Sequence, residues 1–367
     1  MQKKKEIKKN KIKVLNVFEG FSGYGGGSFA LRNISKKHKS FRFNIVGCSE
    51  IDKHADELYN ANHKDINGNT IKNFGDISLI KTKEIPSFDM FMGGFPCQPF
   101  STAGMQKGEK DPYGRGTLFY QIMRICKDKK PRYILMENVK GILSDKFSET
   151  RASMRELLRQ MGYVKNKKDI NEDPLAIALL NSKDYGIPQN RERVWMFARL
   201  GGIPKGFNLT PQKCPNDLRL GDFLDPKETI PESMYLSDKQ VAHLKAKHNI
   251  ASFKVKTPLC FDVYNKKIKT DGYSITITLP EHNSLRVIEP SRRKEIVRKM
   301  TVTEQFRLMG LEGLRDNGRH IDINFAGQSY TQLSRRAGNG WDVNLVTILL
   351  KNIFNQLKDI DSDLYNY

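Results

Sequence analysis

The chain has 367 residues, of which 38% are hydrophobic and 28% charged, a composition typical of a soluble globular protein with a large core. Its 62 lysines and arginines against 41 aspartates and glutamates give a formal net charge of +21, which favours a polyanion as partner over a merely solvated basic surface. No apolar run is long enough to span a membrane, and the basic residues 1–13 lack the apolar core of a secretory signal, so we expect a cytoplasmic protein without a membrane partner.

The cysteines indicate free thiols. There are five, at Cys48, Cys97, Cys126, Cys214 and Cys260, without a Cys-x-x-Cys pair or a histidine at ligand spacing. The sequence therefore predicts neither a disulfide framework nor a metal site, and it fits a reducing compartment.

Four apolar runs within residues 13–140 predict strands, and the segments between them are long enough for crossover helices at 28–34, 55–61 and 117–126. This alternation is typical of a parallel α/β sheet. The runs end at residues of types that bind or react, namely a glycine-rich loop at 19–27, Glu50, Cys97 and Glu137. Because ligands bind at the carboxyl ends of parallel strands, we expect these four features to converge on one cleft.

The glycine-rich loop and Glu50 suit an adenosine ligand, since glycines admit a ligand to the backbone and a carboxylate binds a ribose diol. Ser28 stands where the dinucleotide fingerprint needs its third glycine, which disfavours a nicotinamide cofactor. S-adenosylmethionine needs the glycines and the carboxylate, but it has no phosphate and so needs no phosphate-binding loop. The alternative is a plain turn and a solvated carboxylate at a strand end.

The segment GGFPCQPFS, residues 93–101, holds Cys97 between two prolines that cannot continue a strand. The tight loop presents the thiol, so Cys97 is a candidate nucleophile, with a buried structural thiol as the alternative.

Residues 185–198 predict a strand whose alternation puts Gln189, Arg191 and Arg193 on one face. Such a face can hold a base carbonyl, a phosphate or a thiolate, whereas the alternative is a solvated edge strand with its arginines paired to Glu192 or Asp184. Residues 341–357 have helical apolar spacing and predict a helix packed on the core.

Nine motifs in order resemble those of the DNA (cytosine-5)-methyltransferases, over most of the chain outside about residues 200–295. They are FSGYGG (21–26), Glu50, GDI (75–77), GFPCQPFS (94–101), RGTLF (115–119), ENV (137–139), QNRER (189–193), RKMTVTEQFRLMG (298–310) and AGN (337–339). The resemblance implies an α/β fold, with a Rossmann-like S-adenosylmethionine-dependent methyltransferase domain and a smaller inserted target-recognition domain. It divides the chain into a basic tail at 1–13, a catalytic domain at 14–198 plus 298–367, and a target-recognition domain at 199–297.

The resemblance also implies the site residues. Those for S-adenosylmethionine are Phe21, Gly23, Gly25, Glu50, Ile51, Asp76, Ile77, Pro96, Leu118 and Asn339. The implied catalytic residues are Cys97, Glu137 and Arg193 around the target base, with Arg191 and Gln189 as support. Two features depart from the pattern. First, the extra segment VFEG at 17–20 allows the glycine-loop motif to be aligned on Phe18 and Gly20 instead, but only the alignment on Phe21 gives Phe-x-Gly-x-Gly-Gly. Second, Trp341 stands where the family often has a small aliphatic residue.

The implied reaction is methyl transfer from S-adenosylmethionine to carbon 5 of a flipped-out cytosine in a short specific double-stranded DNA sequence, through a covalent adduct of Cys97. We expect a monomer, in a restriction–modification system or standing alone. Thr278, in ITITL (275–279), resembles a threonine that the family's recognition domain places near a phosphate. One alternative is a transfer-RNA cytosine methyltransferase, a branch that usually has a smaller recognition segment. The other is a silent DNA-binding protein, against which the intact Cys97, Glu137 and Arg193 argue.

Overall fold

The computed structural model describes residues 14–37, 42–96, 118–214, 217–282, 284–311 and 323–361. Its largest element is a six-stranded sheet in the order β2-β1-β3-β4-β7-β5. The strands are β1 (Val14–Gly20), β2 (Arg42–Ser49), β3 (Met90–Gly94), β4 (Tyr133–Val139), β5 (Ala176–Asn181) and β7 (Glu192–Arg199). Strands β1 to β4 pair in parallel, which confirms the predicted parallel sheet, whereas β7 runs antiparallel to both of its neighbours.

Helices cover both faces of this sheet because successive residues of its central strands point to opposite sides. Met90 and Met92 enter one core together with α1 and α9, and Phe91 enters a second core with α4 and α5. The helices are α1 (Gly26–Lys37), α2 (Lys53–Asn62), α4 (Leu118–Lys129), α5 (Ser148–Met161) and α9 (Val343–Leu357). The three predicted crossover helices and the predicted C-terminal helix are therefore confirmed. None of the helices in the described ranges is long and apolar enough to cross a membrane.

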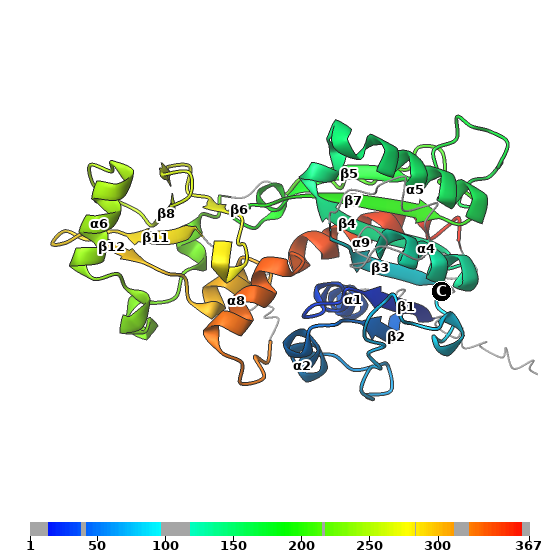
Figure 1. Ribbon diagram of the computed structural model, residues 1–367, viewed down its shortest axis with the longest axis horizontal. Coiled ribbons are helices and arrows are strands. Elements are labelled where there is room, and N and C mark those ends of the chain that lie inside the picture. Colours follow the sequence, from blue (N-terminus) through cyan, green and yellow to red (C-terminus); the bar gives the residue numbers. More distant parts are fainter. Residues whose placement is uncertain are drawn as a thin grey trace, which may run out of the picture.

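A second, antiparallel sheet has the order β12-β11-β8-β9 and lies beside α6. Figure 1 shows this part at the opposite end of the long axis from the six-stranded sheet, with α8 (Tyr330–Asn339) between them. One face of the small sheet forms its own apolar cluster with Phe253, whereas Cys260 and Val287 on the other face join the larger core. The elements are α6 (Asp238–His248), β8 (Leu259–Asp262), β9 (Lys267–Lys269), β11 (Leu285–Glu289) and β12 (Ile296–Arg298). All five lie within 199–297 except for the last residue of β12; the domain division itself stays a prediction.

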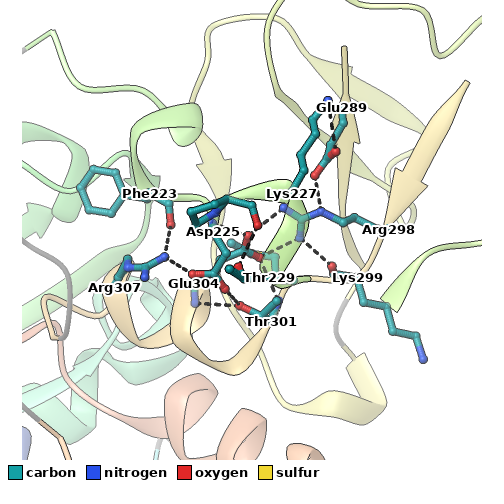
Figure 2. Close-up of polar contacts among 12 residues, drawn as sticks. Phe223, Asp225, Lys227, Thr229, Glu289, Arg298, Lys299, Thr301, Glu304 and Arg307 are labelled. Atoms are coloured by element: carbon teal, nitrogen blue, oxygen red, sulfur yellow. Dashed lines mark hydrogen bonds and ion pairs between the residues drawn. The ribbon is translucent and has the colours of Figure 1, made fainter. Parts of the chain in front are cut away.

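A buried ionic cluster joins the small sheet to α7 (Val302–Arg307) (Figure 2). Arg298, fully buried, donates to Glu289 at 2.5 Å and to both carboxylate oxygens of Glu304 at 2.7 and 2.8 Å. Glu304 also accepts the backbone N–H groups of Thr301 and Asp225. Because bidentate charged pairs have a fixed geometry, this cluster sets how the small sheet meets α7.

The single strand predicted across Gln189, Arg191 and Arg193 is wrong. The chain instead forms β6 (Gln189–Asn190), paired with β10 (Ser274–Ile275), and the separate strand β7 that begins at Glu192. The two are divided at Arg191, whose N–H donates to the carbonyl of Gln189 and to the side chain of Asn181, both at 3.0 Å. A local turn and a side-chain acceptor at the end of β5 thus take the place of a ladder bond, which periodicity does not reveal.

Candidate active site

A cavity of about 330 Å³ opens at the carboxyl ends of the parallel strands. Among the described residues it is lined by Phe21, Gly23, Glu50, Asp52, Ala55, Gly94, Phe95, Pro96, Glu137, Asn138, Val139, Arg191, Arg193, Arg336, Gly338, Asn339 and Gly340. The expected convergence is thus confirmed for the glycine loop, Glu50 and Glu137. Cys97 lies outside the described residues, which reach Pro96 on the cavity wall.

Glu50 ties the glycine loop to the end of β2. Its Oε2 accepts the N–H of Gly23 at 2.8 Å, and its Oε1 accepts the N–H of Asp52 at 2.8 Å. Both Phe21 and Gly23 have left-handed backbone, with φ of 54° and 55°, which turns the loop across the cavity. Phe18, in the alternative frame, is instead buried in the core with Phe91.

Replacing Glu50 with alanine should weaken S-adenosylmethionine binding by about 2 kcal/mol, roughly thirtyfold in Kd, because a charge-assisted contact and the anchor of the loop are lost together. Isothermal calorimetry measures this directly. The matched control is Glu57→Ala on α2, whose carboxylate is half exposed and pairs with Lys53 and His54 outside the cavity. Equal dissociation constants for the two variants would remove Glu50 from the cofactor site.

Glu137 and Arg193 form an ion pair on the cavity wall. Arg193 Nε lies 3.0 Å from Glu137 Oε1, and only 12% of the Glu137 side chain is exposed. Burial raises the pKa of Glu137 above its usual range, although the guanidiniums of Arg193 and Arg191 oppose this. A buried carboxyl group with a raised pKa and a guanidinium partner, on the wall of a cavity, is a candidate for proton transfer.

Arg191 binds three backbone carbonyls from two distant segments of the chain. It donates to the carbonyls of Ile277, Gly338 and Gly340 at 3.0, 3.1 and 2.7 Å and is only 3% exposed. The alternative of a solvated edge strand is therefore wrong for this residue. Arg191 therefore joins the segment around Ile277 to the turn at Asn339 on the cavity wall.

Gln189 lies away from the cavity. Fully buried, it donates to the carbonyl of Leu308 at 2.7 Å and accepts the N–H of Ile277 at 2.9 Å. These contacts join β6 to the segment around Ile277 and to the end of α7. The supporting role of Gln189 stays a prediction.

The remaining predicted cofactor residues have different positions. Pro96 and Asn339 line the cavity, whereas Gly25, Ile51, Asp76, Ile77 and Leu118 do not. Ile51 is 78% exposed beside Glu50, and Ile77 is buried in the core behind it. Gly25, with φ of 84°, lies against the rings of His63 and Tyr59, where a Cβ would collide. The cofactor roles of these residues stay predictions.

Three polar residues at the cavity were not among those predicted. Asn138 donates to the carbonyl of Phe95 at 3.0 Å and so holds the start of the segment that carries Cys97. Arg336, 6% exposed, pairs with Asp52, which also caps the first turn of α2. The motif ENV contains Asn138, and Arg336 lies one helical turn before Asn339, so both had a sequence signal.

Comparison with known proteins identifies the family. The model of the C-5 cytosine-specific DNA methylases matches residues 15–355, so the chain belongs to this family, whose members use S-adenosylmethionine. The orphan methyltransferase M.Rho11sI of Bacillus phage rho11s is 41% identical over 204 residues, which are 56% of this chain and 37% of that protein. The Type II methyltransferase M.NgoBI of Neisseria gonorrhoeae is 32% identical over 328 residues, 89% of each chain. The crystal structure of the S. pombe Dnmt2 methyltransferase has a TM-score of 0.63 at 22% identity, covering 95% of this chain and 99% of that one, and shows the shared fold.

The cavity fits S-adenosylmethionine. Its volume is within the range of small-molecule sites. Phe21 adds an aromatic ring to the lining, Gly23 adds backbone without a side chain, and Glu50 adds a carboxylate, the group that binds a ribose diol in nucleotide sites. The bound cofactor supplies an electrophilic methyl group.

Proposed function

We propose that this protein methylates carbon 5 of a cytosine in a short specific sequence of double-stranded DNA. The observation that carries the proposal is the Glu137–Arg193 pair on the wall of the cofactor cavity, with the segment leading to Cys97 on the same wall. A carboxyl group, a guanidinium and a thiol are the groups that activation of a pyrimidine ring requires.

In the proposed reaction the Cys97 thiolate adds to carbon 6 of the flipped cytosine and makes carbon 5 nucleophilic. Glu137 gives a proton to ring nitrogen 3 as electrons reach it, and Arg193 binds the ring carbonyl oxygen. Methyl transfer to carbon 5 would release S-adenosylhomocysteine. A base then removes the proton from carbon 5, the thiolate leaves as the ring double bond re-forms, and ring nitrogen 3 returns its proton to Glu137.

We further propose that residues 199–297 recognise the DNA and that the protein acts as a monomer. The segment carries many lysines and arginines. Its strand β10 (Ser274–Ile275) pairs with β6, which begins the QNRER motif. Thr278 lies beside Gly338, so a phosphate contact at Thr278 would adjoin the turn at Asn339. Lysines supply salt-dependent phosphate contacts, and loops supply base readout.

The substrate is tested with tritiated S-adenosylmethionine and either unmethylated duplex DNA or transfer RNA. We expect label in the duplex alone, and bisulfite sequencing should show methylation at one short sequence. Label in transfer RNA alone would support the RNA alternative. Cofactor binding without label in either would support a silent DNA-binding protein. The Type II and orphan methyltransferases among the relatives favour DNA, with or without a partner restriction enzyme.

A further inference from the structure

The indole of Trp341 is wedged between the cofactor loop and the strand that leads to Cys97. A Cβ added at Gly94 would lie 2.8 Å from its Nε1, and one added at Gly27 would lie 3.3 Å from its Cζ3. The hydroxyl of Tyr24 donates to the Trp341 carbonyl at 2.5 Å. Gly27, at the end of the glycine-rich loop, and Gly94, in GFPCQPFS, therefore make room for this ring, and Tyr24 of the loop is hydrogen-bonded to the backbone of Trp341.

Trp341 also reaches the proposed acid. Its Nε1–H donates to Glu137 Oε2 at 3.1 Å, while Arg193 Nε contacts Oε1 at 3.0 Å. Each oxygen of the carboxylate thus faces a different donor. A Cβ at Gly94 would also lie 2.6 Å from Glu137 Oε2, so that glycine leaves room for the bond itself.

We propose that Trp341 is a positioning residue that holds the Glu137 carboxylate and couples it to the cofactor loop. The inference rests on the proposed function, because it assumes that Glu137 acts on the base. Trp341 lines a small second cavity behind Glu137 and is not among the residues that line the cofactor cavity. The residue that departs from the family pattern therefore acts through Glu137 rather than by contact with the cofactor.

The charged groups around Glu137 determine the sign of the expected effect. Among the described residues, Arg193 and Arg191 face it from the segment that enters β7, and Asp342 lies across the small cavity. Burial raises the pKa of Glu137, whereas the two guanidiniums and the Trp341 N–H lower it. A bond donated to a carboxylate favours the charged form, so removal of the indole N–H should raise this pKa further.

The test is the pH profile of methyl transfer in Trp341→Phe, which keeps an aromatic ring but loses the donor. The rate should fall as pH rises through the pKa of Glu137, because the protonated form acts on the base. In the variant we expect the midpoint of this fall to move up by about one pH unit, and the maximal rate to drop on the order of tenfold.

Trp195→Phe is the matched control. Its ring packs edge-on against Trp341 at 4.9 Å, yet its Nε1 has no hydrogen-bond partner among the described residues. The control should keep the wild-type midpoint. A Trp341→Phe profile whose midpoint coincides with wild type would overturn the inference, whatever its maximal rate. An inactive wild-type protein would instead refute the proposed function.

A second measurement needs no activity. The chain has two tryptophans, so Trp195→Phe leaves Trp341 as the remaining one. Its fluorescence should change with pH as Glu137 titrates, and Glu137→Gln in the same background should abolish that transition. The same transition in both proteins would overturn the contact with Glu137.

Discussion

Replacing Cys97 with alanine should reduce methyl transfer to less than about a thousandth of the wild-type rate and leave cofactor binding nearly unchanged. The thiolate is needed only after the base has been flipped, because its addition to carbon 6 is what makes carbon 5 reactive. The cofactor site has its own anchor in Glu50 and the glycine loop. Single-turnover rates with labelled cofactor, together with calorimetric Kd values, separate the two effects.

Cys214→Ala is the control for this experiment, since Cys214 is an exposed thiol in another part of the chain. It should keep the wild-type rate. A duplex with 5-fluorocytosine at the target should also trap a covalent complex with the wild-type protein, because fluorine cannot leave carbon 5 as a proton does. Substantial activity of Cys97→Ala, or a trapped peptide without Cys97, would refute the covalent mechanism.

Replacing Arg298 with methionine should lower the free energy of unfolding by about 3–5 kcal/mol, since two buried carboxylates would lose their main cationic partner. Glu304 would keep two backbone N–H donors, whereas the cation left beside Glu289 among the described residues would be Lys227, whose Nζ lies 3.6 Å from its carboxylate. Equilibrium unfolding in urea measures the loss. The damage should reach catalysis too, because the cluster joins the small sheet to α7.

The comparison variant is Arg155→Met. It makes the same substitution at Arg155 on α5, which forms a surface ion pair with Asp173. That pair is about a third to a half exposed, so its loss should cost about 0–1 kcal/mol. If Arg298→Met were no more destabilising than Arg155→Met, the buried cluster would not stabilise the junction.

Local patterns in the sequence were enough to predict the catalytic sheet and its cleft. Short apolar runs that end in glycine or in a carboxylate predict buried parallel strands, because the residues at the end of each run determine where the strand stops. The glycine loop, Glu50 and Glu137 therefore appear together at the carboxyl edge, as expected. The helical spacing of 341–357 likewise predicted α9, because one turn of a helix depends mainly on residues three and four apart.

The tertiary structure decided the features that depend on distant partners. Gln189 and Arg191 fit one alternating strand, but Asn181, Ile277 and Leu308 supply the hydrogen bonds that take them out of it. Trp341 and Glu137 are 204 residues apart, and their contact follows from the space left at Gly94. The sequence by itself determined the class of sheet and the residue types at its edge, because these depend on near neighbours. Which side chains bond across the site was decided by packing, because hydrogen bonds of a few ångströms join segments that no sequence period relates.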